Sequence, residues 1–231
     1  MSKNFAKREA KDYTFFTTFF QRFCVSFLFW PFYTIMYNMK VYGRENIPRD
    51  RSILLAANHT SLLDPPAVAA AVSTGGKTVA YMAKRELFDI PILRTLIWWL
   101  GAFAVNREKL QASTIKTAKA ALASKHWTMA LFPQGGRRRN DKLNKVNKGF
   151  ITLAKLTQTD ILPVGIILKD YKIAKKPFEG NMIIKMGTVI SHEKEVDEIM
   201  AEWKKQVCEM TGLIDNSSEF ENEQNTESVK G

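Results

Sequence analysis

Cysteine and histidine are scarce in this chain of 231 residues. The two cysteines, Cys24 and Cys208, lie in unrelated contexts, which excludes a disulfide framework and favours a reducing compartment. The three histidines, His59, His126 and His192, have no neighbours at metal-ligand spacing, so we predict no metal site. The chain also lacks the G-x-S-x-G sequence that exposes a nucleophilic serine in one large class of hydrolases.

Acidic residues are outnumbered by basic ones, 23 against 34, except near the C-terminal end. The net charge is +11, and the tail after Gly212 has five acidic residues and one lysine, a charge of −4, which leaves +15 for the rest. A body of this charge is drawn to anionic lipid surfaces. Nucleic acid is the rival partner, but the chain has no zinc-finger or RNA-recognition signature. We therefore predict an anionic membrane surface and no nucleic acid as partner.

Long apolar runs are scarce as well. An aromatic stretch without charge covers 17 residues from Phe23 to Met39, between Arg22 and Lys40, at the lower limit for spanning a bilayer. Pro31 interrupts it, and no small-residue cleavage site of a secretory signal follows. We expect a pair of short helices, bent near Pro31, that lie in the membrane interface. A single spanning anchor and a helix packed on the domain's own core are the alternatives.

From residue 40 onward, strand patterns alternate with helix patterns. The runs Ile53–Ala57 and Leu162–Ile167 are apolar throughout or nearly so, as is typical of strands buried on both faces. We predict an α/β fold with a largely parallel central sheet and helices on both faces, preceded by the N-terminal membrane-interface helical segment. Strands are expected at 40–43, 52–57, 78–83, 102–106, 128–132, 161–167 and 182–189, and helices at 65–72, 92–99, 110–124, 148–157 and 195–210.

The same patterns divide the chain into three parts. Residues 1–40 form the membrane-associated segment, and residues 41–212 form the main domain. Residues 213–231 are rich in Asn, Glu, Ser, Gln and Thr, a composition that predicts a disordered acidic tail.

The most informative stretch is the octet from Asn58 to Pro65, Asn-His-Thr-Ser-Leu-Leu-Asp-Pro. It follows a predicted buried strand, at the kind of strand end where open α/β sheets hold their ligands. Asp64 there could accept the hydrogen bond of one imidazole nitrogen of His59. The other nitrogen would then be free to take a proton from an attacking hydroxyl. An aspartate before a proline is also the pattern of an ordinary helix N-cap.

Three further segments follow this octet in order. They are Lys-Arg-Glu-Leu-Phe from Lys84, running on to Arg107; Phe-Pro-Gln-Gly-Gly-Arg, ending at Arg137; and Ile-Leu-Pro-Val-Gly-Ile from Ile161. In order and spacing, the four blocks resemble the 1-acylglycerol-3-phosphate acyltransferase family, whose first block is H-x-x-x-x-D. The resemblance extends from about Val41 to about Ile190.

The resemblance implies an enzyme at the cytoplasmic face of a membrane. It would move a fatty acyl group from a thioester of coenzyme A or acyl carrier protein to the free hydroxyl of 1-acylglycerol 3-phosphate, giving phosphatidate. No cofactor is implied beyond the acyl donor. His59 would be the general base, and Asp64 would orient its imidazole.

Substrate-binding candidates lie at the ends of other predicted strands. Gly135 and Gly136 allow a tight turn whose backbone amides can face an anion. Arg137 offers a bidentate fork for a phosphate. Lys84 and Arg107 also follow predicted strands, so we expect three cations to meet at one edge of the sheet.

Three positions depart from the family's third block. Gln134 stands where the family has Glu, Gly136 where it has Thr, and Arg138 where it has Ser. The family's Glu is linked to holding the glycerol phosphate of the acceptor, so the resemblance makes Gln134 a substrate-binding candidate as well. Gln keeps a carbonyl oxygen but loses the charge, so the identity of the acceptor stays open. A different lyso-lipid, glycerol phosphate, thioester hydrolysis and a non-catalytic lipid-binding protein are the alternatives. Ser61 is the candidate for an acyl-serine intermediate, although direct attack by the lipid hydroxyl is simpler.

The apolar stretch 91–100, which contains two tryptophans, has two interpretations. It could line a tunnel for the acyl chain, or it could pack against the sheet as an ordinary core helix. Apolar stripes at helical spacing are mostly core, and we favour that interpretation.

Overall fold

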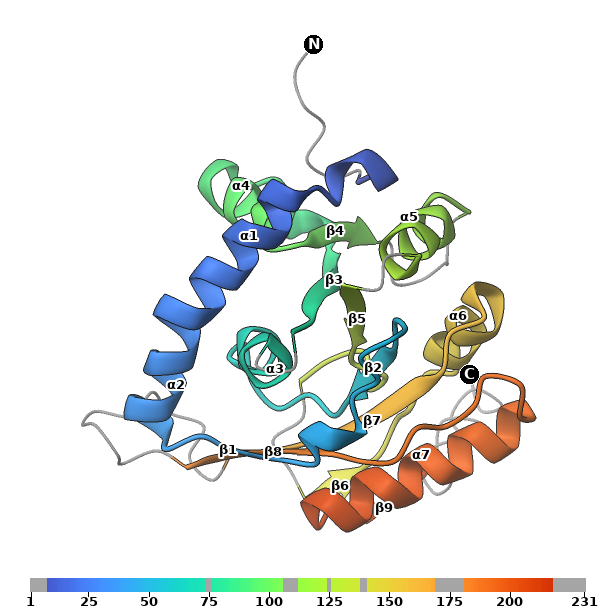
Figure 1. Cartoon of the computed structure of the whole chain (residues 1–231). Helices are drawn as coiled ribbons and strands as arrows, with labels where there is room; N and C mark the ends of the chain where they lie inside the picture. Colours follow the sequence, from blue (N-terminus) through green and yellow to red (C-terminus); the bar gives the residue numbers. More distant parts are fainter. Residues whose placement is uncertain are drawn as a thin grey trace, which may run out of the picture.

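The computed structural model describes residues 8–73, 76–105, 112–123, 126–137, 141–168 and 181–217. A seven-stranded sheet with the order β1-β8-β7-β2-β5-β3-β4 forms its centre (Figure 1). Neighbouring strands are parallel except β7 and β8. The strands are β1 (Lys40–Tyr42), β2 (Leu54–Ala57), β3 (Thr78–Lys84), β4 (Ala102–Val105), β5 (Trp127–Leu131), β7 (Ile161–Leu168) and β8 (Met182–Met186).

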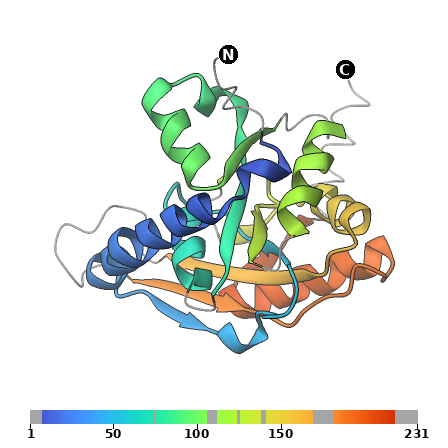
Figure 2. The ribbon, with the colours of Figure 1, turned by 45° about the horizontal axis from the view of Figure 1, so that its top comes forward.

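Helices cover both faces of this sheet (Figure 2). Successive residues of β2 point to opposite faces, and they enter two different core clusters. Leu55 and Ala57 pack in the cluster that contains α3, whereas Leu54 and Ala56 pack in the cluster that contains α5, α6 and α7. The predicted α/β class is confirmed. The helices are α3 (Asp64–Ser73), α4 (Pro91–Trp99), α5 (Ala112–Leu122), α6 (Gly149–Thr157) and α7 (Val196–Thr211).

The predicted elements are all present, with ends that shift by at most a few residues. The pattern of β8 predicted a strand but not its direction, and the structure places it antiparallel to β7. Two short strands were not predicted: β6 (Lys142–Leu143) pairs with β9 (Ile214–Asp215). Residues 214–215 of the predicted tail are therefore tied to the domain, and residues 218–231 lie outside the described part.

The N-terminal segment is helical from Phe15 to Tyr37. It consists of α1 (Phe15–Cys24), a π-helical turn (Val25–Phe29) and α2 (Trp30–Tyr37), which follow one another without a loop (Figure 1). The wide turn ends just before Pro31, whose ring and missing N–H would disturb a regular helix. The break expected near Pro31 is thus a local widening inside one continuous helical segment.

One face of this segment is buried and the other is exposed. Cys24, Val25, Tyr33 and Tyr37 are buried, and the last three join the cluster around α3. The segment therefore packs on the domain's own core while its opposite face stays free. Within the described ranges, no helix combines the length and the apolarity needed to cross a membrane.

The helix α4 is less buried than a core helix. Trp98 is its one fully buried side chain, whereas Ile92 is 86% exposed and Leu96 47% exposed. Trp99 packs against Phe16 and Phe20 of α1. The favoured interpretation of stretch 91–100 as ordinary core was wrong for most of the helix, because α1 covers only part of it.

Candidate active site

His59 and Asp64 meet directly after β2, as the spacing predicted. His59 Nδ1 lies 2.8 Å from Asp64 Oδ2. The Asp64 side chain is fully buried and that of His59 is 13% exposed. The Nε2 atom of His59 has no hydrogen-bond partner within the described part of the chain. A carboxylate on one nitrogen and an open second nitrogen is the arrangement of a general base with its orienting group.

The Asp64 carboxylate is fully occupied by the loop that precedes it. Its Oδ2 also accepts the backbone N–H groups of Thr60, at 2.6 Å, and Ser61, at 2.8 Å, and its Oδ1 accepts the Thr60 hydroxyl at 3.1 Å. All these donors come before α3 in the chain. Asp64 begins α3, but its side chain orients the loop before the helix, which is not the pattern of an ordinary N-cap.

The third block holds His59 from the other side. Gln134, which is 3% exposed, accepts the backbone N–H of His59 on Oε1 at 2.6 Å. The ring of Phe132 stacks on the imidazole with a centroid distance of 4.2 Å and an interplanar angle of 27°. The parallel pairing of β2 with β5 brings the two blocks together. Gln134 was predicted to bind substrate, and the structure shows that its carbonyl oxygen already holds the backbone of the loop that carries His59.

Residues that the sequence did not single out fix the rest of this loop. The Asn58 side chain bonds both backbone groups of Ile166, donating to the carbonyl at 2.9 Å and accepting the N–H at 2.6 Å. The hydroxyl of Tyr33 donates to the Leu63 carbonyl, and that of Tyr81 donates to the Pro65 carbonyl, each at 2.7 Å. No local pattern marks these tyrosines, because their partners lie 30 and 16 residues away.

The turn Phe132–Gly135 lies beside the His59–Asp64 pair. The N–H of Gly135 donates to the Phe132 carbonyl at 3.0 Å, and Gly135 has φ +67°, a conformation that favours glycine. A Cβ at this position would lie 2.7 Å from Asn147 Nδ2. Gly135 is therefore required by the turn itself. Gly136 has open space around it, and Arg137 is exposed at the end of the turn.

The other predicted cations are placed less completely. Lys84 ends β3, at the same edge of the sheet as the His59–Asp64 pair. Its Nζ forms an exposed ion pair with Glu86 at 2.9 Å. Arg107 lies outside the described residues. Binding of a phosphate by Lys84, Arg107, Gly135, Gly136 and Arg137 thus stays a prediction.

Ser61 is not arranged as a nucleophile. Its hydroxyl accepts the Leu63 N–H at 3.2 Å, and its own N–H donates to Asp64. Within the described part of the chain, the Ser61 hydroxyl makes no hydrogen bond to His59. This geometry favours direct attack by a substrate hydroxyl over an acyl-serine intermediate.

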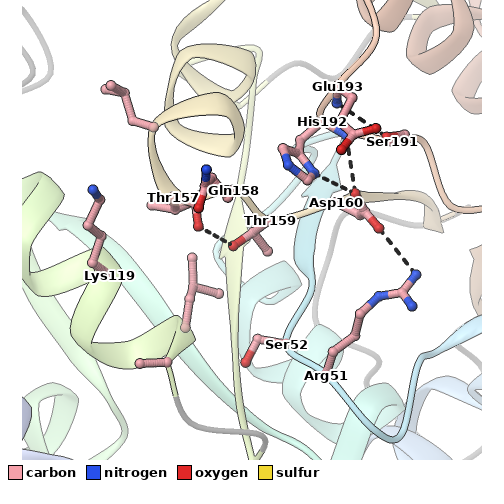
Figure 3. Close-up of a pocket in the computed structure, with 13 residues that line it drawn as sticks. Arg51, Ser52, Lys119, Thr157, Gln158, Thr159, Asp160, Ser191, His192 and Glu193 are labelled. Carbon is pink, nitrogen blue, oxygen red and sulfur yellow. Dashed lines mark hydrogen bonds and ion pairs between the residues drawn. The ribbon is translucent and has the colours of Figure 1, made fainter.

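A second His–Asp pair lines a pocket at the opposite edge of the sheet (Figure 3). His192 Nδ1 lies 2.7 Å from Asp160 Oδ1, and Arg51 lies 3.2 Å from Asp160 Oδ2. Burial raises the pKa of Asp160, but the hydrogen bonds from His192 and the charge of Arg51 outweigh burial and hold it below its ordinary value. The pocket has a volume of about 660 Å³. Because Arg51 precedes β2 and His59 follows it, the two pairs are separated by the length of that strand.

A family model described as Acyltransferase matches residues 38–167. The chain is 34% identical to a 1-acyl-sn-glycerol-3-phosphate acyltransferase of Streptococcus pneumoniae over 131 residues, which are 55% of this chain and 46% of that protein. It is 28% identical to the protein of that name from Bacillus subtilis over 149 residues, 64% of this chain and 68% of that one.

A solved structure is similar over more of the chain. It is the 1-acyl-sn-glycerophosphate (LPA) acyltransferase PlsC of Thermotoga maritima, with a TM-score of 0.60 and 26% identity. The similarity covers 83% of this chain and 75% of that one. The chain spans about half the length of some of the curated relatives that it matches, such as the protein of Borreliella burgdorferi, at 50%.

Proposed function

Because the chain belongs to the Acyltransferase family, we propose that it transfers a fatty acyl group from a thioester to the free hydroxyl of 1-acylglycerol 3-phosphate. The observation that carries this proposal is the His59–Asp64 pair, with Nδ1 held by a buried carboxylate and Nε2 open. The product would be phosphatidate, a precursor in phospholipid synthesis. Curated relatives of this chain carry the name of that activity.

The chemistry follows from the two nitrogens of His59. Nε2 takes the proton of the acceptor hydroxyl while the hydroxyl oxygen attacks the carbonyl carbon of the thioester. The tetrahedral intermediate collapses, the carbon–sulfur bond breaks, and the thiolate receives the proton from the imidazolium. Asp64 stabilises the transient positive charge and fixes the tautomer. A positioned base of this kind contributes roughly 10²–10⁴ to the rate.

The acceptor phosphate requires a cationic site near this base. Arg137 stands at the end of the turn that Gln134 joins to His59. Its guanidinium can form two parallel hydrogen bonds to a phosphate. We propose Arg137 as the main phosphate contact, with the backbone amides of Gly135 and Gly136 beside it and Lys84 and Arg107 as further cations.

Membrane association is the second part of the proposal. Along α1 and the π-helical turn, Phe15, Phe19, Phe23 and Phe27 recur every four residues and form a row of neighbouring rings. Their exposed fractions are 86, 56, 48 and 67%. Such a row is costly in water and suits the interfacial region of a bilayer. The charge of +15 outside the tail would add attraction to anionic lipids at a cytoplasmic face.

The identity of the molecule that receives the acyl group needs its own test. Gln134 replaces the family's Glu, and a different lyso-lipid or glycerol phosphate is the second candidate. The test is to incubate the purified chain with lipid vesicles, a labelled acyl thioester of coenzyme A or of acyl carrier protein, and one acceptor at a time. Fastest product formation with 1-acylglycerol 3-phosphate is expected. Faster transfer to another acceptor would show that 1-acylglycerol 3-phosphate is not the preferred substrate. Release of free fatty acid alone would indicate thioester hydrolysis.

A further inference from the structure

The helical segment Phe15–Tyr37 touches the catalytic loop Asn58–Pro65 through Tyr33. Tyr33 lies on α2 and is 1% exposed. Its hydroxyl donates to the Leu63 carbonyl at 2.7 Å, and that carbonyl also accepts the N–H of Ala67 in the first turn of α3. Since Leu63 immediately precedes Asp64, this bond fixes the peptide unit that joins the loop to the orienting carboxylate.

A second tyrosine holds the other side of Asp64. Tyr81 of β3 donates its hydroxyl to the Pro65 carbonyl, also at 2.7 Å. The two carbonyls that flank Asp64 are therefore held by phenols from two separate elements, α2 and β3. The backbone position of Asp64 determines whether its carboxylate lies 2.8 Å from His59, and misplacement of a catalytic group by about 1 Å can cost roughly 100-fold in rate.

The Tyr33 hydroxyl is a donor that packing alone does not require. A phenylalanine would fill the same space in the core cluster around α3, and a buried hydroxyl is unfavourable unless it is hydrogen bonded. Burial raises the pKa of Tyr33, and the nearby charge of Asp64 raises it further. The phenol thus stays protonated, and its hydrogen bond to the loop persists over the pH range in which enzymes work.

The opposite face of the same helical segment carries the exposed phenylalanine row (Phe15, Phe19, Phe23 and Phe27). We propose that Tyr33 is a positioning residue that couples the seating of this segment to Asp64, so that the His59–Asp64 pair is aligned only while the segment is docked against α3. The effect of this coupling on the rate of acyl transfer rests on the proposed function. Its structural consequence, the geometry of His59 and Asp64, does not require turnover.

The kinetic test compares Tyr33→Phe with Tyr37→Phe in the full chain. Tyr37 lies one turn further along α2 and is equally buried, but its hydroxyl donates no hydrogen bond to residues 58–65, all of which are described. For Tyr33→Phe we expect kcat to fall roughly 10-fold, with both Michaelis constants and vesicle binding unchanged. The same fall is expected with a dispersed short-chain acceptor, since the coupling is intramolecular.

A spectroscopic test reads the pair directly. With ¹⁵N-labelled histidine, the Nδ1 proton resonance of His59, assigned by its loss in His59→Gln, should shift in Tyr33→Phe and stay in place in Tyr37→Phe. Tyr33→Met, which keeps an apolar side chain without a donor, replaces Tyr33→Phe if that variant does not fold.

Two results would overturn the coupling: an unchanged His59 resonance together with wild-type kcat in Tyr33→Phe, or equal losses in both tyrosine variants, which would mean general packing. Absence of acyl transfer in the wild type would refute the proposed function instead. The resonance would still decide the role of Tyr33.

Discussion

Among single residues, the site depends most on Asp64, a buried carboxylate that accepts hydrogen bonds from three successive residues of a short loop, His59 to Ser61. Asp64 accepts hydrogen bonds from His59 Nδ1, from two backbone N–H groups and from the Thr60 hydroxyl. The loop and the His59–Asp64 pair therefore form one unit, and the same carboxylate that holds the imidazole also shapes the backbone around it. Changes at Asp64 should affect catalysis through both routes.

Asp64→Asn should lower kcat for acyl transfer about 100-fold or more, because a neutral amide neither fixes the tautomer nor stabilises the imidazolium. The measurement is the initial rate of product formation at saturating acceptor. His192→Gln is the matched control, since it removes the histidine of the second His–Asp pair at the other edge of the sheet. Comparable losses in both variants would contradict the assignment of Asp64.

Gln134 offers a second test at the same scale. Gln134→Glu keeps an oxygen that can accept the His59 N–H, so we expect activity within about threefold of wild type if the acceptor is 1-acylglycerol 3-phosphate. Gln134→Leu removes the oxygen that accepts this hydrogen bond and leaves the partly buried N–H of His59 without its partner. The loss should cost about 1–3 kcal/mol, or roughly 5- to 150-fold in activity. Steady-state kinetics of the two variants distinguish these outcomes. Equal activity of both would show that the hydrogen bond to His59 is dispensable.

Arg137→Ala tests the phosphate contact. Loss of one charge-assisted contact is worth about 1.5–3 kcal/mol, or roughly 10- to 150-fold in affinity. It should therefore raise the Michaelis constant for the phosphorylated acceptor and leave that for the acyl donor nearly unchanged. A parallel rise in both constants would reassign Arg137 to a general structural role.

Among the secondary-structure elements, the parallel strands carry two charged sites, one at each of their ends. The pair His59–Asp64 follows β2, whereas Arg51 and Asp160 precede β2 and β7. The cluster of Arg51, Asp160 and His192 joins three connections at one edge of the sheet. We ascribe to it a structural role, which predicts a dependence of stability on pH.

The folded-state pKa of Asp160 is held below its ordinary value of 3.8. A depressed carboxyl pKa contributes stability above the unfolded value, and this contribution is lost as the pH falls through the folded value. Asp160→Asn should therefore unfold at a lower temperature than wild type near neutral pH, and the difference should shrink on acidification below pH 3.8. Thermal unfolding at a series of pH values checks this. A difference that is constant with pH would contradict the ionic contribution.

The sequence predicted the helices and strands well, but strand pairing and the contacts between distant elements less well. Apolar strands such as Ile161–Leu168 are visible because both faces are buried, but the direction of β8 depends on pairing, which periodicity does not encode. His59, Asp64 and Gln134 were predicted because they lie in contiguous blocks. Tyr33 and Tyr81 were missed because their hydrogen bonds join distant elements. Neither the aromatic run around Tyr33 nor the strand pattern around Tyr81 marks a tyrosine that contacts the loop Asn58–Pro65.

At the scale of the whole molecule, the N-terminal segment belongs to two surfaces at once. Its inner face completes the core around α3, and its outer face presents the phenylalanine row. The alternative of a helix packed on the core is thus confirmed for the inner face, whereas contact of the outer face with a membrane stays a prediction. If the outer face lies in a membrane as proposed, the segment would bring the His59–Asp64 end of the sheet close to a lipid substrate.

The double variant Phe19→Ser, Phe23→Ser should bind anionic vesicles far more weakly than wild type. Burial of one phenylalanine side chain is worth about 1.5–3 kcal/mol, so the loss should be roughly 10-fold or more for each ring. Vesicle flotation at low and high salt measures this loss of binding. The control is Ile214→Ser, which changes an apolar residue of β9 that is 57% exposed. Equal flotation of the double variant and wild type would remove the phenylalanine row from the membrane surface.

The proposed function depends above all on His59, which we propose activates a lipid hydroxyl for attack on an acyl thioester. The most direct measurement is the initial rate of phosphatidate formation by wild type and His59→Ala, on vesicles that contain 1-acylglycerol 3-phosphate and a saturating acyl donor. We predict that wild type forms phosphatidate and that folded His59→Ala is slower by at least roughly 100-fold. A folded His59→Ala variant that keeps half of the wild-type rate would contradict the account.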